Sequence, residues 1–331
     1  MKKGFYFMRE NVMAKFKNFK VSVAQVSPCS KPEMLEKIDK MATEAAKNGA
    51  KLILFPEASI GGYPRGNDFA CAIGSRGEKG RDDFMRYWEN AVDLPGPELD
   101  KLCAIAKKND IYITTGVIER DGHTVYCTAV FVSNDGRFLG KHRKVMPTGS
   151  ERLIWGFGNG STLPVIDTDV GKIGAVICWE NYMPLLRSAM YSEGVELYLA
   201  PTADGRETWL PSMRHIAMEG RCFVLTCNII AHRNDYAENY GPAPSEDENK
   251  LVSTGGSCII DPFGKVLAGP NYTDECILYA DVDLGQIARG KFDMDVVGHY
   301  GRPDIFQLKV NRTDVKPVTS FVVDDTMEEE V

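Results

Sequence analysis

The chain has 331 residues, of which 44% are hydrophobic, enough for one large α/β domain or two smaller ones with a sizeable core. Its net charge is −7 and it has no concentrated basic stripe, which argues against a nucleic-acid partner. No segment approaches the roughly 18 consecutive apolar residues of a membrane helix, so we expect no membrane span.

The first residues predict a leader that takes no part in the fold. Residues 1–20 are basic, but their apolar residues are scattered and no small-residue cleavage site follows, which is atypical of a signal peptide. Met8 and Met13 are alternative starts to Met1. We therefore expect residues 1–17 to be a disordered leader.

Strand-like runs rich in Val, Ile and aromatic residues alternate with helical patterns along most of the chain. In chain order we expect a strand at 19–26, a helix at 32–48, a strand at 51–55, helices at 81–92 and 97–109, strands at 111–119, 124–133 and 172–177, a helix at 183–193, a strand at 196–200, a helix at 208–220, and strands at 222–228, 256–260 and 277–282. Asp121-Gly122 and Asp135-Gly136 predict hairpin turns, so the middle of the chain is predicted to be a meander.

The inner strands are apolar on both faces, which indicates sheet packed on sheet with helices outside. We expect a four-layer α/β/β/α sandwich formed by one domain over residues 18–307, followed by a tail at 308–331 with an acidic, solvated end. Two loops, 61–81 and 232–251, are expected to line the site or a subunit contact, and surface disorder is an alternative for the second.

Cysteine and histidine usage predicts a reduced protein without a metal site. Nine cysteines are scattered without a Cys-x-x-Cys pair, as in cytoplasmic proteins with free thiols. Five histidines lack metal-ligand spacing, and we expect no cofactor.

Two residues at predicted strand ends are candidates for catalysis. Cys178 lies between the apolar run 172–177 and the helical pattern 183–193, where a helix dipole favours a thiolate, although buried cysteine is often only apolar filler. Glu57 follows Leu-Ile-Leu-Phe-Pro, so it also stands at a carboxyl end of a strand, where α/β sheets place their clefts.

The segments around these residues resemble the nitrilase superfamily. They are Glu57-Ala-Ser-Ile-Gly-Gly-Tyr63-Pro, Gly-Lys-His-Arg-Lys144-Val-Met-Pro-Thr, Glu151-Arg-Leu-Ile-Trp-Gly, Cys178-Trp-Glu-Asn-Tyr-Met-Pro-Leu-Leu-Arg and Ala-Pro-Thr-Ala-Asp204-Gly. They are more similar to the nitrilase branch than to its amidase or carbamoylase relatives, and the resemblance runs from about residue 18 to 307.

The resemblance implies the same sandwich and a nitrilase that converts a nitrile to the acid and ammonia through a thioimidate and a thioester. It implies that Cys178 is the nucleophile, Glu57 the general base, Lys144 the cationic stabiliser and Glu151 a supporting carboxylate. Without it, Lys144 and Glu151 would suggest an ordinary surface ion pair.

Four aromatic residues are candidates for substrate binding on position alone, with a place in the core as the alternative: Tyr63, Trp179, Tyr182 and Trp209. His142 and His215 could pair with a cysteine, but the local signature of a papain-like site is missing.

Other functions remain open at this stage. The alternatives are a cyanide hydratase or dihydratase, an amide or carbamoyl hydrolase, and a non-enzymatic, thiol-bearing assembly protein. The resemblance also implies a homodimer or a larger homo-oligomer such as a spiral, with the two loops and the tail as contacts. Neither the identity of the nitrile nor the ratio of acid to amide follows from the sequence.

Overall fold

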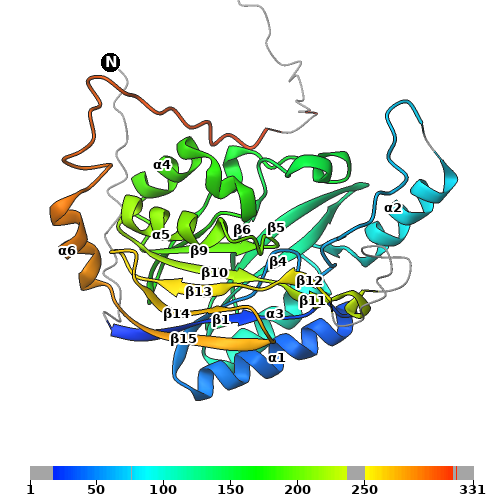
Figure 1. Ribbon diagram of the computed structural model, residues 1–331, viewed down its shortest axis with the longest axis horizontal. Helices are drawn as coiled ribbons and strands as arrows, with labels where there is room; N and C mark the ends of the chain where they lie inside the picture. Colours follow the sequence, from blue (N-terminus) through cyan, green and yellow to red (C-terminus); the bar gives the residue numbers. More distant parts are fainter. Residues whose placement is uncertain (1–17, 76, 237–249, 316–317, 319–331) are drawn as a thin grey trace, which may run out of the picture.

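The computed structural model describes residues 18–75, 77–236, 250–315 and 318. In this part of the chain two large sheets of seven and six strands lie face to face, with helices on their outer faces (Figure 1). The predicted four-layer α/β/β/α sandwich is confirmed. The predicted leader 1–17 and the acidic end of the tail lie outside the described residues.

The first sheet is built mainly from the N-terminal half of the chain, in the order β15-β1-β2-β4-β5-β6, with β3 paired to β4. β1, β2 and β4 are parallel, whereas β5 and β6 continue as an antiparallel meander. Gly122 and Gly136 take positive φ angles at the two predicted hairpin turns. The strands are β1 (Asn18–Gln25), β2 (Ala50–Leu54), β3 (Val92–Asp93), β4 (Tyr112–Asp121), β5 (Thr124–Val132), β6 (Phe138–Arg143) and β15 (Cys276–Asp283).

The second sheet has the order β14-β13-β10-β9-β8-β7, and its central strands β8, β9 and β10 are parallel. Its strands are β7 (Val165–Thr168), β8 (Gly171–Ala175), β9 (Leu197–Thr202), β10 (Phe223–Asn228), β13 (Ser257–Ile260) and β14 (Val266–Asn271). A separate ribbon pairs β11 (Ile230–His232) with β12 (Leu251–Thr254) and flanks part of the predicted second loop, of which 237–249 lies outside the described residues.

Alternation along the strands divides the apolar side chains between three cores. Leu52 and Leu199 point into the core between the two sheets. Their neighbours Ile53 and Tyr198 point outward, to the helices of the first and the second sheet respectively. Because both faces are covered, these strands are apolar throughout, as the sequence indicated.

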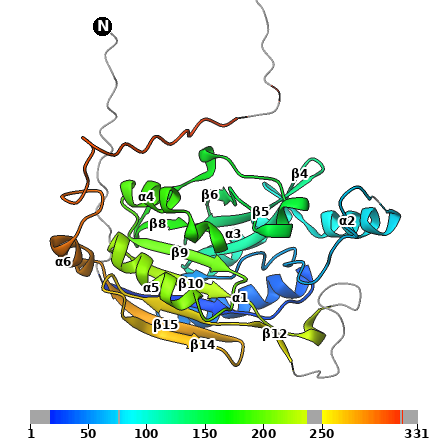
Figure 2. The same cartoon turned by 45° about the horizontal axis from the view of Figure 1, so that its top comes forward.

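Helices α1 (Lys31–Lys47) and α3 (Pro97–Asn109) cover the outer face of the first sheet, and α4 (Pro184–Ser192) and α5 (Trp209–Gly220) cover that of the second. The remaining two, α2 (Glu78–Asn90) and α6 (Gly285–Asp293), lie at opposite sides of the sandwich (Figure 1). Ser30 and Glu33 form a capping box that fixes the start of α1. In Figure 2, α2 stands out from one side of the sandwich at the end of the predicted first loop. Among the described residues, no helix is long and apolar enough to cross a membrane.

The elements that the sequence did not predict are short or lie at an edge. β14 contains Gly269 and Pro270 and is only partly buried, so it lacks an apolar run. α6 contains Gly285 and Gly290, which weaken the helical pattern, and buries little apart from Ile287. Neither element contributes a residue to the site described below.

Candidate active site

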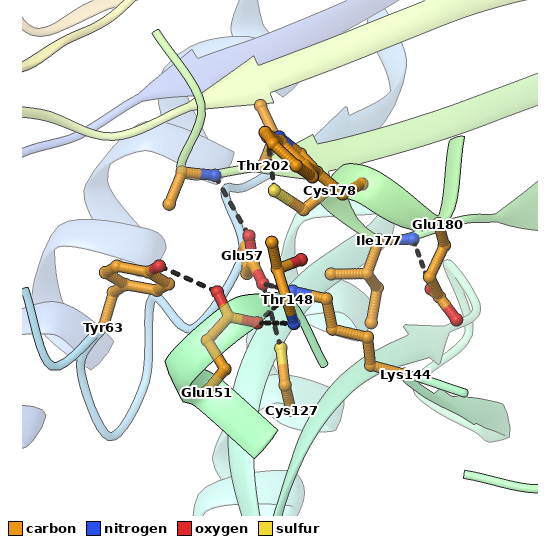
Figure 3. Close-up of polar contacts among 12 residues, drawn as sticks. Glu57, Tyr63, Cys127, Lys144, Thr148, Glu151, Ile177, Cys178, Glu180 and Thr202 are labelled. Carbon is orange, nitrogen blue, oxygen red and sulfur yellow. Dashed lines mark hydrogen bonds and ion pairs between the residues drawn. The ribbon is translucent and has the colours of Figure 1, made fainter. Parts of the chain in front are cut away.

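Three strand ends bring the predicted residues together. Glu57 follows β2 of the first sheet, Lys144 directly follows β6 of the same sheet, and Cys178 follows β8 of the second sheet. Figure 3 shows their side chains pointing toward one another at the junction of the two sheets. Glu57 and Cys178 thus follow the carboxyl ends of parallel strands, as expected for sheets of this kind, whereas Lys144 follows the antiparallel strand β6.

A close contact with β4 holds the turn that carries Glu57. Gly116 donates its N–H to Pro56 O at 3.0 Å and accepts from Ile60 N at 3.2 Å. A Cβ atom at Gly116 would lie 2.6 Å from Glu57 Cα and 2.4 Å from Ala58 N. Glycine is thus required at this position for the turn to pack against the strand.

Lys144 lies between two carboxylates in the buried interior. Its Nζ is 2.7 Å from Glu57 Oε1 and 2.8 Å from Glu151 Oε2, and the side chains of Lys144 and Glu57 are 0% exposed. The Tyr63 hydroxyl donates to Glu151 Oε1 at 2.8 Å, and Thr148 N donates to Glu151 Oε2 at 2.6 Å. The ammonium group is therefore fixed in place by the two glutamates.

Cys178 begins a short 3₁₀ turn (Cys178–Tyr182) in a conformation with φ of 51°, which is unusual for a residue with a side chain. The Thr202 hydroxyl donates to its Sγ at 3.2 Å, and Asn181 Nδ2 donates to its carbonyl at 2.7 Å. Ala203 N donates to Glu57 Oε2 at 3.0 Å. The consecutive residues Thr202 and Ala203, at the end of β9, thus contact both the thiol and the glutamate.

Burial controls the protonation of the cluster. Burial, reinforced by the charge of Glu57, raises the pKa of the Cys178 thiol, and burial also raises the pKa of Glu57. Burial by itself lowers the pKa of Lys144, but the nearby negative groups, Glu57 first, raise it overall. Burial thus favours the thiol form of Cys178, the nearby negative groups favour the cation of Lys144, and burial increases the basicity of Glu57.

The burial of Cys178 works against the thiolate form that the sequence led us to expect. The turn after Cys178 is a short 3₁₀ turn, and the helix α4 begins only at Pro184, so the dipole of a longer helix does not act directly on the sulfur. Deprotonation of Cys178 requires a base, and Glu57 is the buried carboxylate beside it.

A second thiol, which the sequence did not single out, also contacts Glu57. Cys127 Sγ lies 3.4 Å from Glu57 Oε1, and its backbone carbonyl accepts from Lys144 N at 2.8 Å. Cys127 lies on β5 and faces the core between the sheets. Alternation along 124–132 could have placed its side chain inward, but nothing in the sequence paired it with Glu57.

A hollow of about 540 Å³ opens above the cluster, with Cys178 on its wall. Its lining includes Tyr63, Arg65, Glu151, Cys178, Trp179, Arg206 and Thr254. Trp179 is 39% exposed, donates its indole N–H to Asp204 at 2.8 Å, and lies under the Arg206 guanidinium at 4.4 Å. Two of the four aromatic candidates, Tyr63 and Trp179, thus line the hollow.

The other two aromatic candidates lie behind Trp179. Tyr182 packs edge-on against Trp179 and against Trp209, and neither Tyr182 nor Trp209 is among the residues that line the hollow. Trp209 is 2% exposed in the core under α5, where its indole N–H donates to Thr226 at 2.9 Å. The position of Trp209 fits the core alternative rather than direct contact with a ligand.

The two candidate histidines lie elsewhere. His142 is buried and pairs with Glu180, whereas His215 is largely exposed on α5. Within the described residues, neither ring has a hydrogen bond with Cys178, and no group of three or more His, Cys, Asp or Glu side chains could hold a metal ion. The arrangement instead offers a nucleophile, a base and a fixed cation, the groups needed to attack an electrophilic carbon.

Comparisons with known proteins identify the family of the chain. The carbon-nitrogen hydrolase family model matches residues 20–292. A bifunctional nitrilase/nitrile hydratase of Nicotiana tabacum is 56% identical, with 87% of this chain and 84% of the relative covered. Nitrilase 3 of Arabidopsis thaliana is 53% identical (90% and 88% covered), and a nitrilase of Bradyrhizobium diazoefficiens is 50% identical (91% and 95%).

Solved structures show the same fold at lower sequence identity. A carbon-nitrogen hydrolase from Helicobacter pylori superposes with a TM-score of 0.70 at 21% identity, covering 88% of this chain and 98% of that one. The fold, the family model and the curated relatives lead to one assignment: the chain belongs to the carbon-nitrogen hydrolase family, and within it to the nitrilase branch.

Proposed function

We propose that this protein is a nitrilase that hydrolyses a nitrile to a carboxylic acid and ammonia. The observation that carries the proposal is the fixed Lys144 ammonium, 2.7 Å from Glu57 and 2.8 Å from Glu151, beside the buried thiol of Cys178. Curated relatives named nitrilases are 50 to 53% identical over most of the chain, which supports this activity over the amide and cyanide alternatives.

In the proposed first step, Cys178 attacks the nitrile carbon. Glu57 takes the thiol proton and passes it to the nitrile nitrogen, so that an S–C bond forms, the triple bond becomes a C=N bond, and a neutral thioimidate results. The basicity of Glu57 suits this transfer because burial raises its pKa. Lys144 and the backbone N–H of Trp179 offset the developing negative charge, a contribution of about 3 kcal/mol per donor.

Water then attacks the thioimidate carbon with Glu57 as the base, giving a tetrahedral intermediate that carries OH, NH₂ and the sulfur. Loss of ammonia leaves a thioester, and a second water releases the acid and restores the thiol. Loss of the thiol instead would give the amide. Relatives from Lupinus angustifolius and Nicotiana tabacum are named bifunctional nitrilase/nitrile hydratases, so both products need to be measured.

The test is a panel of aliphatic, aromatic and arylacetonitriles, with cyanide and the matching amides included. Ammonia, acid and amide are quantified for the wild type and for Cys178→Ala. We expect ammonia and acid from at least one nitrile, loss of turnover in the variant, and a wild-type adduct on Cys178 by intact mass. Turnover of cyanide alone or amides alone would contradict the proposal. A biological role that survives Cys178→Ala would favour the assembly alternative.

We also propose that Tyr63 and Trp179 contact the substrate, because both line the hollow beside Cys178. For Tyr182 a substrate contact stays a prediction, since its ring packs against Trp179 from outside the lining. Trp209 would influence the substrate only through Tyr182, against which it packs edge-on.

The domain is proposed to extend over 18–307.

A homo-oligomer in the cytoplasm completes the proposal. Exposed apolar side chains such as Leu185, Phe292 and Phe306 offer surface for contacts between copies. Nine free cysteines fit a reducing compartment. Light scattering on the full chain and on a chain ending at Gln307 tests the tail as a contact, and an unchanged particle mass would remove it.

A further inference from the structure

Glu180, the last residue of the Cys-Trp-Glu segment, takes no part in the chemistry proposed above. Its side chain is nevertheless 0% exposed, and it lies in the same turn as Cys178. A buried carboxylate costs free energy unless hydrogen bonds compensate it, so its partners indicate what it does.

The carboxylate of Glu180 bonds to the backbone on both sides of the site. Its Oε1 accepts from Val145 N at 2.6 Å, and its Oε2 accepts from Ile177 N at 2.9 Å. Val145 follows Lys144 on the first sheet's side, and Ile177 precedes Cys178 on the second sheet's side. One side chain thus joins the neighbours of both reactive residues.

A third contact joins the carboxylate of Glu180 to β6, the strand that precedes Lys144. His142, on β6 and 0% exposed, places Nε2 2.9 Å from Glu180 Oε2, while its Nδ1 bonds to the carbonyl of Thr162. A carbonyl and a carboxylate can only accept, so these two contacts fit an imidazolium, which donates from both ring nitrogens. Burial lowers the pKa of His142, but Glu180 raises it overall.

We propose that the buried Glu180–His142 ion pair is a positioning device that fixes the distance between the Cys178 thiol and the Lys144 ammonium. Cys178 and Lys144 follow strands of different sheets, so their separation depends on how the two sheets are held together. A displacement of about 1 Å at a reacting group can lower the rate about 100-fold. The inference rests on the proposed function only in taking Cys178 as the nucleophile.

Asn181 provides an instructive contrast within the same turn. Its amide donates to Val176 O and Cys178 O, so it fixes the backbone of the nucleophile locally. These two bonds stay within the segment that carries Cys178. Glu180 also reaches Val145, beside Lys144, and its role therefore concerns the geometry between two segments.

The test measures the intrinsic reactivity of Cys178 in Glu180→Gln and Glu180→Asp. Glutamine keeps the length but turns an amide nitrogen toward a donor, and aspartate keeps the charge but is one methylene too short to span both N–H groups. The rate constant of Cys178 alkylation by iodoacetamide is followed by peptide mass spectrometry without any nitrile. We expect both variants to react about 10- to 100-fold more slowly than wild type, with kcat falling far more than KM changes.

Glu119→Gln is the matched control. Glu119 is a buried carboxylate that pairs with Lys141 and Arg143 of β6, the strand that precedes Lys144, and among the described residues none of its hydrogen-bond or ion-pair partners lies in the Cys178 turn. We expect it to lower the free energy of unfolding without slowing the alkylation of Cys178. Glu180 variants that lose stability but are alkylated at the wild-type rate would overturn the inference.

The alkylation measurement still tests the inference if the Glu180 variants do not fold or if the wild type hydrolyses no nitrile. If the Glu180 variants do not fold, His142→Gln leaves both backbone bonds to Glu180 possible and removes only the imidazolium. Slower alkylation then supports the positioning role, and an unchanged rate overturns it. If wild type hydrolyses no nitrile, the proposed function fails, while the alkylation rates still decide the role of Glu180.

Discussion

The buried cluster and the rim of the hollow above it are built in different ways. In the cluster, Glu57 and Lys144 are fully buried and bonded to each other and to neighbouring elements. At the rim, Trp179 and Arg206 are exposed; they contact each other and Asp204, and Trp179 also packs against Tyr182. The cluster is thus fixed by buried ion pairs and hydrogen bonds, whereas the rim consists of exposed side chains. Under the proposed function, we expect the cluster to govern the reaction and the rim to govern the choice of nitrile.

Removing the cation at the centre of the cluster should have the largest effect. Lys144→Met leaves the carboxylates of Glu57 and Glu151 buried without their shared partner, so we expect loss of turnover and a drop of about 3–5 kcal/mol in the free energy of unfolding. Lys141→Met, on the strand that precedes Lys144, is the control, because its partner Glu119 keeps Arg143. Normal turnover in Lys144→Met would mean that the cluster is not the reacting centre.

The acid side of the pH profile tests the same cluster. Burial raises the pKa of Glu57 from 4.5, so as pH falls through this raised pKa the base is protonated and turnover should drop, about tenfold per pH unit. Stability has the opposite pH dependence. Protonated Glu57 stabilises the folded protein at pH values below the pKa that this residue has in the unfolded state, and this stabilisation is lost as pH rises through its raised pKa in the folded state. Profiles of kcat/KM and of unfolding against pH measure both. An acid limb centred near 4.5 would contradict the assignment.

Tyr63 lies at the boundary between the two regions. Tyr63→Phe removes the hydroxyl that donates to Glu151 and keeps the ring on the lining of the hollow. We expect a loss of about 1.5–3 kcal/mol in transition-state stabilisation, seen as lower kcat/KM. Tyr279→Phe, whose hydroxyl accepts a bond from Asn48 at the surface, should leave turnover unchanged. If Tyr63→Phe had the same kcat/KM as Tyr279→Phe, the hydroxyl of Tyr63 would have no role in the buried cluster.

The smallest expected effects concern Trp179 and Trp209, which both pack edge-on against the ring of Tyr182. Trp179→Phe at the rim should change KM and the order of preference among nitriles, with unfolding altered by less than about 0.5 kcal/mol. Trp209→Phe in the core should keep that preference and lower the free energy of unfolding by about 1–3 kcal/mol, because Thr226 loses its donor. Kinetics on the nitrile panel and denaturant unfolding measure both. The reverse pattern would remove the distinction between rim and core.

Sequence patterns predicted the parts of this structure that depend on residues close together in the chain. Apolar runs placed Glu57 and Cys178 at strand ends, and helical spacing located α1, α3, α4 and α5 within a few residues. The family resemblance then linked these residues to Lys144 and Glu151, which the structure brings together.

Contacts that depend on strand order escaped prediction. Cys127 meets Glu57 only because β5 lies next to β4, and Thr202 meets Cys178 only because β9 lies next to β8. Trp209 shares its aromatic character with Trp179, and only the packing of α5 separates a core ring from a lining one. Side-chain type and periodicity do not record which strands are adjacent.

The end of β9 links the thiol and the glutamate of the cluster through two consecutive residues. Thr202 bonds to the sulfur of Cys178 and the next residue, Ala203, bonds to the carboxylate of Glu57. One short backbone segment therefore contacts both side chains, and we expect a substitution that shifts the end of β9 to disturb the surroundings of Cys178 and Glu57 together.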